Sequence, residues 1–526
     1  MALIDAYTQN LTARQVSHLL RRTAFGATPT QIKSFTGKKV DVVVQQLFKQ
    51  QATPPDPTDE NQKTSHDLAW GGPAATDAER NNFDGVRRTR LKYWWLGLMT
   101  NQAVSLTEKL TLFWQNHFVS TSAAVPDVRF LYRQNQLLRK FVLGNFRDFV
   151  IEVTKDPAML VYLSGNSNVV SKPNENYGRE LMELFTIGRG NYTEEDVKAV
   201  ARVLTGWRSL NYRSSTVATV SFEFRSTQHD TADKIFSDHF QKKVIKGRAG
   251  ATAGDDELKD VVAMILEQPE TARFIIRKFY RFFIQADISG QVEKEFIEPL
   301  AAIFRKDYEL KPVLTAFFKS QHFFDESLYG SQIKSPLDLI IGTLRSFNYA
   351  LPDPIKDRAK YDAATNYFQA RSREQQMDVL DQVDVFGWRP FYDTDFYELW
   401  INSTTLAHKG AWTDYVVRGS TAIALDINTL SLPSLTSLPQ ILTDQESAYI
   451  MVRELTDSLM EFSLTEDQIK YIVEQPLMAG APYYEWTEIW NAYIKAPNDV
   501  MKKSAAKTRL DRMMTYILRL AEYQMG

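Results

Sequence analysis

The sequence predicts a mainly α, multi-helix globular protein with a small β-hairpin insertion and long loops. Apolar residues recur every three to four positions through most of the chain, and capping residues precede several of these runs. Strict alternation of apolar and polar residues is confined to one short stretch. The chain has 526 residues, 44% of them apolar, whereas a single core stops growing near roughly 250–300 residues, so two or three helical units are expected.

The helices are predicted from periodicity and caps. One is expected over residues 105–120, because Ser105 and Glu108 have the spacing of a capping box and five apolar residues follow on one face. A second is expected from about Glu194 to Trp207, with Thr193 as its N-cap. Further helices are predicted over residues 176–187, 257–267, 269–285, 292–306, 312–320, 335–349, 446–462, 466–474 and 498–525.

Stretches rich in Pro, Gly and polar residues separate these helices. They divide the chain into an N-terminal helical segment (1–50), an exposed loop or lid (51–80), a helical core with the candidate site (81–208), a loop and β insertion (209–256), a helical domain (257–350), a loop-rich segment (351–426) and a C-terminal helical segment (427–526). The insertion contains TVATVSFEF, which predicts a short strand pair. Residues 351–366 and 427–443 are expected to be linkers.

Composition excludes several classes of function. Sixty-two basic and sixty-four acidic residues leave a net charge of −2, so bulk charge does not favour general binding of nucleic acid or of anionic membranes. The absence of cysteine excludes thiol catalysis, cysteine-ligated metals and disulfides. No apolar run reaches the length of a membrane span, and the first residues do not form a secretory signal. We therefore expect a cytoplasmic protein by default, with export left open.

Several long motifs occur in a recognisable order. They include HLLRRTAFG (18–26), LTLFWQNHF (110–118), PNENYGRELMELFTIGRGNYTEEDV (173–197), ARVLTGW (201–207), QHDTADK (228–234), KSPLDLIIGTLR (334–345) and DVFGWRPF (384–391). The chain resembles the bacterial family known as domain of unknown function 1800. The resemblance implies no catalytic assignment, but it implies a partner encoded by a neighbouring gene of the domain of unknown function 1501 family. The glycine-rich stretch expected after the Gly-Trp element is replaced here by RPFYDTDF.

Polar residues crowd the stretch from Asp156 to Arg208, where a candidate site is predicted. Glu180 and Glu183 are three residues apart on one helix face, so one carboxyl group with a raised pKa can act as general acid or base and the other as its partner. Residues expected to orient a substrate there are Asn174, Glu175, Asn176 and Arg179. The alternative is a surface ladder of the ion pairs Glu175–Arg179 and Arg179–Glu183.

Two histidines extend this candidate site. His117 shares the apolar face of its helix and is expected to be buried, either as a core residue or as a metal ligand or base. His229 and Asp230 lie in an irregular loop and supply a second imidazole and a further catalytic carboxylate. If His117, His229, Glu180 and Glu183 converge, the ligand set suits a divalent zinc, manganese or iron ion.

Two functions from different classes follow. The first is a hydrolase with a Glu/His cleft, with or without a divalent metal. The second is a non-catalytic helical partner or binding protein, in which the polar cluster is a buried network that fixes helix packing. Open, solvent-reachable carboxyl groups would favour the hydrolase, and sealed, fully paired ones would favour the network. An Arg21 or Arg22 side chain that paired with Glu180 or Glu183 would hold those carboxylates ionised.

Overall fold

The computed structural model describes residues 2–58, 77–214, 216–217, 219–392, 394–418 and 442–526. Its first half contains α1 (Ala13–Ala24), α2 (Pro29–Phe35), α3 (Val40–Leu47), α4 (Asp77–Asn101), α5 (Thr107–His117), α6 (Val128–Lys140), α7 (Phe146–Lys155), α8 (Pro157–Tyr162), η1 (Gly165–Ser167), α9 (Glu175–Glu183) and α10 (Glu194–Val203). The predicted mainly α fold is confirmed, since the strands of the described residues form only two small antiparallel pairs.

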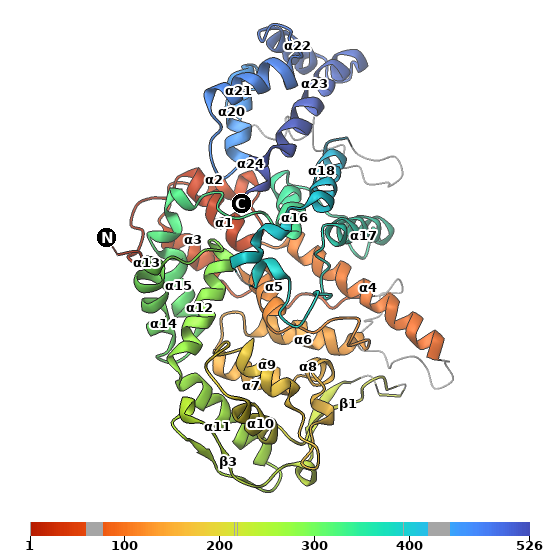
Figure 1. Cartoon of the computed structure of the whole chain (residues 1–526). Coiled ribbons are helices and arrows are strands. Elements are labelled where there is room, and N and C mark those ends of the chain that lie inside the picture. Colours follow the sequence, from red (N-terminus) through yellow and green to blue (C-terminus); the bar gives the residue numbers. More distant parts are fainter. Residues whose placement is uncertain (1, 59–76, 215, 218, 393, 419–441) are drawn as a thin grey trace.

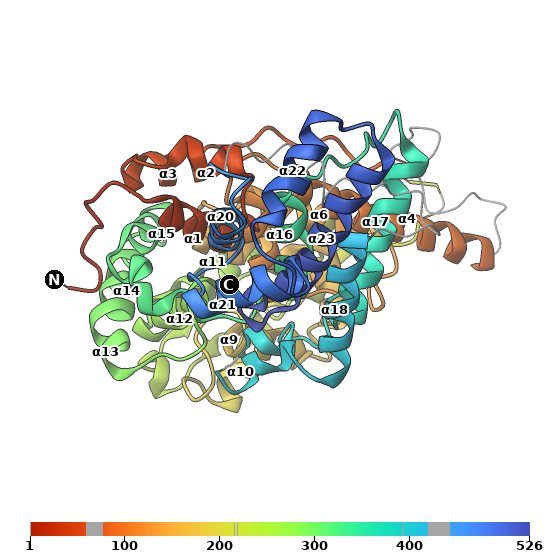
Figure 2. The ribbon, with the colours of Figure 1, turned by 90° about the horizontal axis from the view of Figure 1, so that it is seen from above.

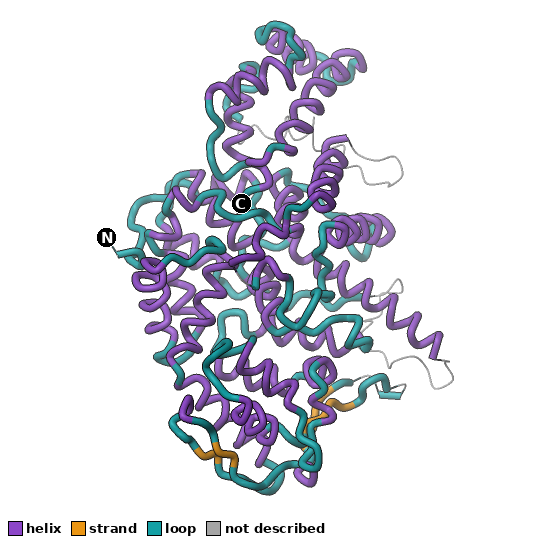
Figure 3. Tube along the Cα trace, in the orientation of Figure 1, coloured by secondary structure: helices purple, strands orange, loops and turns teal. Residues whose placement is uncertain are grey.

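The strands follow α10. They are β1 (Trp207–Leu210), β2 (Ser221–Phe224), β3 (Lys234–Ile235) and β4 (Val244–Ile245), with η2 (Ser226–Gln228) and η3 (Asp238–Phe240) between them. β1 pairs with β2 and β3 pairs with β4, both antiparallel. The two patches of strand stand out from the helical trace in Figure 3.

The remaining elements are again helical. They are α11 (Ala253–Glu267), α12 (Pro269–Phe283), α13 (Gly290–Val292), the π-helical η4 (Glu293–Ile297), α14 (Glu298–Phe304), α15 (Leu310–Lys319), η5 (His322–Phe324), η6 (Glu326–Leu328), α16 (Pro336–Ser346), α17 (Arg358–Glu374), η7 (Arg389–Phe391), η8 (Thr394–Trp400), α18 (Ser403–Arg418), α20 (Ala448–Leu459), α21 (Glu466–Ile472), the π-helical η10 (Val473–Leu477), α22 (Glu485–Lys495), α23 (Val500–Arg519) and α24 (Ala521–Gln524). No helix of the described residues is both long and apolar enough to cross a lipid bilayer.

The helix starts test the predicted caps. Thr193 caps α10 in a capping box with Asp196, as its position predicts. The capping box predicted at Ser105 is wrong, because α5 begins at Thr107 after an N-cap, Leu106, that makes no side-chain bond. The carboxylate of Glu108 is used elsewhere: it accepts from the Trp95 indole at 2.8 Å. A tertiary partner thus outcompetes the local cap.

Three further boundaries differ from the prediction. The helix expected to reach Trp207 ends at Val203, and Gly206 at φ +95° turns the chain into β1. The predicted small β-hairpin is confirmed, but TVATVSFEF supplies only its strand β2, which pairs with β1. The linker expected over 351–366 is shorter than predicted, because α17 begins at Arg358. Residues 59–76 of the expected lid and 427–441 of the second linker lie outside the described residues.

Two large hydrophobic clusters make up the interior. The first gathers buried residues of α1, α3, α5, α7 and α9–α15, and the second gathers those of α4, α16–α18 and α20–α23. Leu19 and Leu20 of α1 belong to the first cluster, whereas Phe25, just past the end of α1, belongs to the second. Figure 1 shows α20–α23 stacked at one end of the molecule and α7–α11 at the other, with α1 and α16 between them. Figure 2, seen from above, shows α20 and α21 lying over α1 and α12.

Candidate functional site

The N-terminal end of α9 is held by asparagines of the predicted site. The Asn174 side chain accepts from the backbone N–H of Asn176 at 3.0 Å, and the Asn174 N–H donates to the Asn168 side chain at 2.9 Å. The Asn176 amide donates to the Leu163 carbonyl at 3.3 Å. These bonds fix the connection from α8 to α9. A substrate-binding role for Asn174 and Asn176 stays a prediction.

Arg179 takes part in ion pairs on the surface of α9 and α10. Its guanidinium donates two bonds to Glu194, at 2.6 and 2.7 Å, and lies 3.5 Å from the Glu175 carboxylate. The Glu175–Arg179 pair was predicted, whereas Glu194 replaces Glu183 as the second partner. Exposed pairs of this kind are screened by solvent, so Arg179 and Glu194 tie α9 to α10 only weakly.

The two glutamates at the end of α9 have different surroundings. Glu183 is largely buried and bonded, because its carboxylate accepts from Arg189 Nε at 2.5 Å and from the Tyr192 hydroxyl at 2.9 Å. The Glu180 carboxyl is only partly buried, and among the described residues no hydrogen bond or ion pair engages it. Burial and the neighbouring Glu183 charge raise the pKa of Glu180 to about 7.

Side chains distant in sequence share the electrostatic field of Glu180. The charge of Asp384 is one of the contributions that raise the pKa of Glu180. Burial, together with the charges of Asp384 and Glu180, raises the pKa of the Tyr162 hydroxyl to about 12. Glu180, Asp384 and Tyr162 therefore lie within electrostatic reach of one another, although they come from three separate segments of the chain.

His117 and Lys278 clamp the carboxyl end of α9. The Lys278 ammonium donates to the Leu184 carbonyl at 3.1 Å and lies 3.3 Å from His117 Nδ1, while His117 Nε2 lies 3.1 Å from the Phe185 carbonyl. Because Nε2 faces a carbonyl, it carries the proton and Nδ1 accepts. Burial, then the Lys278 charge, lowers the pKa of His117 well below its ordinary value. Burial and Arg281 lower the pKa of Lys278 to about 7. The predicted burial of His117 is confirmed.

The Gly-Trp segment covers this pair. The backbone N–H of Trp388 donates to the Asn116 side chain at 2.7 Å, next to His117. Phe386 and Tyr392 complete a narrow cavity of about 10 Å³ with His117 and Lys278, which is room for roughly one water molecule. The segment therefore covers His117, which is buried, whereas Lys278 remains partly exposed.

Gly387 is needed for this close approach. A Cβ atom there would lie 2.3 Å from Asn116 Oδ1 and 2.6 Å from the Asn116 carbonyl oxygen, and φ is +89°. Gly387→Ala should therefore lower the free energy of unfolding by about 1–3 kcal/mol, measured by urea denaturation. Gly410→Ala is the matched control: Gly410 lies within α18 with no atom in reach of its Cβ, so a gain of about 0.5–1 kcal/mol is expected. Equal stability of the two variants would contradict this role of Gly387.

His229 and Asp230 belong to a second polar cluster. His229 Nδ1 lies 3.0 Å from the Thr205 carbonyl, and Nε2 lies 3.2 Å from Glu257 Oε1. Glu257 also accepts from Lys234 Nζ at 2.5 Å, and both of these side chains are fully buried. Asp230 accepts from Arg202 Nε at 2.6 Å. The His229 partners are enclosed, which favours a structural network here.

The described residues contain no group of three or more His, Asp or Glu side chains placed to hold a metal ion. The convergence of His117, His229, Glu180 and Glu183 is therefore not found in this part of the chain. His117 contacts Lys278 and the end of α9, whereas His229 contacts Thr205 and Glu257. Metal binding by either histidine stays a prediction.

Four side chains of this site were not predicted from the sequence. Lys278 follows Phe274 and Ile275 at helical spacing, so a lysine on an apolar face was a readable signal for a perturbed amine. Tyr192 and Arg189 lie within the same long motif as Glu183 and were overlooked as its partners. The nearness of Asp384 to Glu180 left no signal, because about 200 residues separate them.

Comparison with known proteins identifies a family but no activity. A family model described as "Protein of unknown function (DUF1800)" matches residues 18–525. No curated protein matches this chain, and no solved structure matches it.

Proposed function

The chain belongs to the DUF1800 family, whose description assigns no function, and we propose from the site itself that it is a hydrolase using Glu180 as its general acid and base. The observation that carries the proposal is the Glu180 carboxyl group, which has a pKa raised to about 7, is partly exposed and has no bonding partner among the described residues. A carboxyl group that is half ionised near neutral pH can both remove a proton from water and return one to a leaving group.

The neighbours of Glu180 support this role. Arg189 and Tyr192 hold the Glu183 carboxylate in place, and its charge favours the protonated form of Glu180. Tyr162, within the same field, offers a hydroxyl group that can orient a substrate. A pair of carboxyl groups in unequal surroundings is the arrangement by which enzymes separate the pKa values of an acid and its partner. The proposed hydrolysis uses the Glu180 carboxyl group with or without a divalent metal ion.

The activity test compares two glutamate variants. A panel of p-nitrophenyl esters, phosphates and glycosides reports hydrolysis by absorbance. Glu180→Gln should lower kcat/KM for the best substrate about 10²–10⁴-fold and leave the fold unchanged. Glu195→Gln, an exposed glutamate at the start of α10, should keep full activity. Hydrolysis that survives in Glu180→Gln would overturn the proposal.

A stability test needs no substrate. Because the pKa of Glu180 is raised in the folded state, its contribution to stability is present below the unfolded pKa, near 4.3, and is lost as pH rises through about 7. Glu180→Gln should therefore match the native chain at pH 4.5 and be more stable by about 1–3 kcal/mol at pH 8.5. Carbon-13 NMR of labelled glutamate provides the direct titration, and a Glu180 pKa below 5 would contradict the proposed role.

The second candidate is a non-catalytic binding protein. The enclosed network of His229, Lys234 and Glu257 favours it, because sealed and paired polar groups fix packing instead of reacting. In this case the neighbouring-gene product of the domain of unknown function 1501 family would be the partner. Stable co-purification of the two chains, with an unaltered complex in Glu180→Gln, would favour this candidate.

A further inference from the structure

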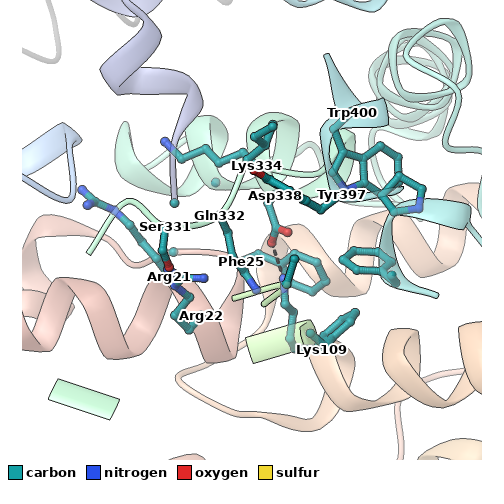
Figure 4. A pocket seen from close by; sticks show the side chains of 18 of the residues that line it. Arg21, Arg22, Phe25, Lys109, Ser331, Gln332, Lys334, Asp338, Tyr397 and Trp400 are labelled. Carbon is teal, nitrogen blue, oxygen red and sulfur yellow. Dashed lines mark hydrogen bonds and ion pairs between the residues drawn. The ribbon is translucent and has the colours of Figure 1, made fainter. Parts of the chain in front are cut away.

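A pocket lies where the first and last parts of the chain meet. Its walls come from α1, α5, α12, the segment that leads into α16, the η7–η8 segment and the residues around α24. Figure 4 shows Arg21 and Arg22 on one side, Tyr397 and Trp400 on the other, and Lys109 with Asp338 between them. The pocket contains none of the residues assigned above to the α9 site.

The polar wall of the pocket is strongly cationic. Arg21, Arg22, Lys109 and Lys334 line it, with Asp338 as the carboxylate among the described lining residues. Lys109 pairs with Asp338. Arg281 lines the same space and has a further contact of its own. Arg21 pairs with Glu461, which does not itself line the pocket. Two carboxylates against four such cations leave an excess of positive charge, which favours an anionic occupant.

Two donors in this wall have hydrogen-bonding capacity left over. Arg22 is 4% exposed and gives its terminal nitrogens to the Ile284 and Leu328 carbonyls, but its Nε is buried with no hydrogen-bond partner among the described residues. The Lys334 ammonium carries three protons, and the acceptor found for it is the Tyr523 carbonyl at 2.6 Å. Buried donors without partners carry a free-energy cost, which a bound oxyanion would relieve.

Burial also lowers the pKa values of the lysines at this pocket. Burial, with the charges of Arg21 and Lys409, lowers the pKa of Lys334 to about 7, although Glu461 and Asp338 act in the opposite direction. The Lys334 ammonium also lies 4.2 Å from the Tyr523 ring centroid. Lys409, behind Lys334, has a pKa lowered to about 7 by burial. An anion in the pocket would favour protonation of both lysines.

Aromatic side chains also line the pocket. Phe25 and Phe282 lie against the Lys109 ammonium, whose Nζ is 4.6 and 5.2 Å from their ring centroids, and Tyr397 and Trp400 lie on the side away from Arg21 and Arg22 (Figure 4). The cavity has a volume of about 60 Å³, room for roughly four to six water molecules, and it is continuous with open solvent. A compact charged head fits beside the cations, and a flat ring fits against Tyr397 and Trp400.

We propose that this pocket binds a small organic anion in which a phosphate or carboxylate head is joined to a flat, apolar body. Arg22 and Lys334 bind the head, and Trp400 and Tyr397 pack against the body. The site is separate from the α9 carboxyl groups and holds whether or not Glu180 is catalytic.

Calorimetry with phenyl phosphate, benzoate, inorganic phosphate and phenol at pH 7 and physiological salt tests this proposal. Phenyl phosphate or benzoate should bind at least tenfold more tightly than phenol and than inorganic phosphate, and the tighter of the two identifies the head group. Lys334→Gln should weaken binding of the better aryl anion at least tenfold. Lys198→Gln, which removes an exposed lysine of α10, should leave it unchanged. No binding of either aryl anion at 1 mM, or equal binding by Lys334→Gln, would overturn the proposal.

A second variant and a pH series guard against a folding defect in Lys334→Gln. Trp400→Leu should weaken the aryl anion at least fivefold while leaving inorganic phosphate unaffected. Between pH 7 and pH 9 the aryl anion should bind at least fivefold more weakly, because Lys334 and Lys409 lose their protons while the ligand keeps its charge. Affinity that is independent of pH, together with an unaffected Trp400→Leu variant, would contradict the proposed binding mode.

Discussion

Replacing Glu461 by glutamine should lower the free energy of unfolding by about 3–5 kcal/mol at neutral pH, because it leaves buried cations without their counter-charge. Glu461 is 1% exposed and lies just past α20. Its carboxylate is 2.8 Å from His18 Nδ1 and 3.4 Å from Arg21, both on α1. The Glu461 carbonyl also accepts from Arg14 at 2.9 Å. This residue joins the first helix to the C-terminal helices. Arg21 therefore pairs with Glu461 and not with Glu180 or Glu183, the pairing that would have held those carboxylates ionised.

Urea unfolding followed by tryptophan fluorescence measures this loss. Glu466→Gln is the matched control, because Glu466 pairs with Arg453 on the open surface and should change stability by less than about 1 kcal/mol. Burial alone would raise the pKa of Glu461, but His18, Arg21 and Arg22 hold it well below its ordinary value. Its contribution is therefore complete above the unfolded pKa, near 4.3, and is lost as pH falls below it. A difference between native and Glu461→Gln that grows toward pH 3 would refute this assignment.

Glu257→Gln should destabilise the β3–α11 region by a similar amount, about 3–5 kcal/mol. The change leaves the Lys234 ammonium, which is fully enclosed, with the Asp230 carbonyl but without its carboxylate. Burial alone would raise the pKa of Glu257, but bonds from His229, Lys234 and the Arg248 N–H hold it below its ordinary value. Hydrogen exchange should show faster opening of α10 and α11, while α20 and α23 stay protected.

A double variant separates the charge from the packing. Lys234→Met with Glu257→Leu removes both charges and keeps the apolar volume, so it should recover most of the lost stability. Lys243→Gln serves as the surface control, because Lys243 pairs with Glu267 in an exposed position. If Glu257→Gln unfolds like the native chain, the network of His229, Lys234 and Glu257 does not stabilise the fold.

Local spacing predicted what depends on neighbours within one or two turns. The helix that carries Glu180 and Glu183, the burial of His117 and the Thr193 cap follow from residues three or four positions apart. The fold class follows for the same reason, since helices are stabilised by short-range bonds. The partners of these residues do not follow from local spacing, because tertiary packing decides which side chains meet.

In the candidate site, contacts between distant segments could not be predicted from local spacing. The pKa of Glu180 depends in part on Asp384, and His117 meets Lys278 across 161 positions of sequence. Trp207, which helical periodicity had assigned to α10, belongs to β1 and pairs with β2. In each case the local pattern fits one structure, but a contact with a distant segment decides the structure that forms.

The contact between α1 and Glu461 also affects how the chain folds during its synthesis. His18 and Glu461 are 443 residues apart, and at ~5–20 residues per second a ribosome needs about 20–90 s to make the intervening polypeptide. For that interval His18 and Arg21 lack the Glu461 carboxylate. The polar contacts between α1 and the C-terminal helices therefore form only after nearly the entire chain has been made.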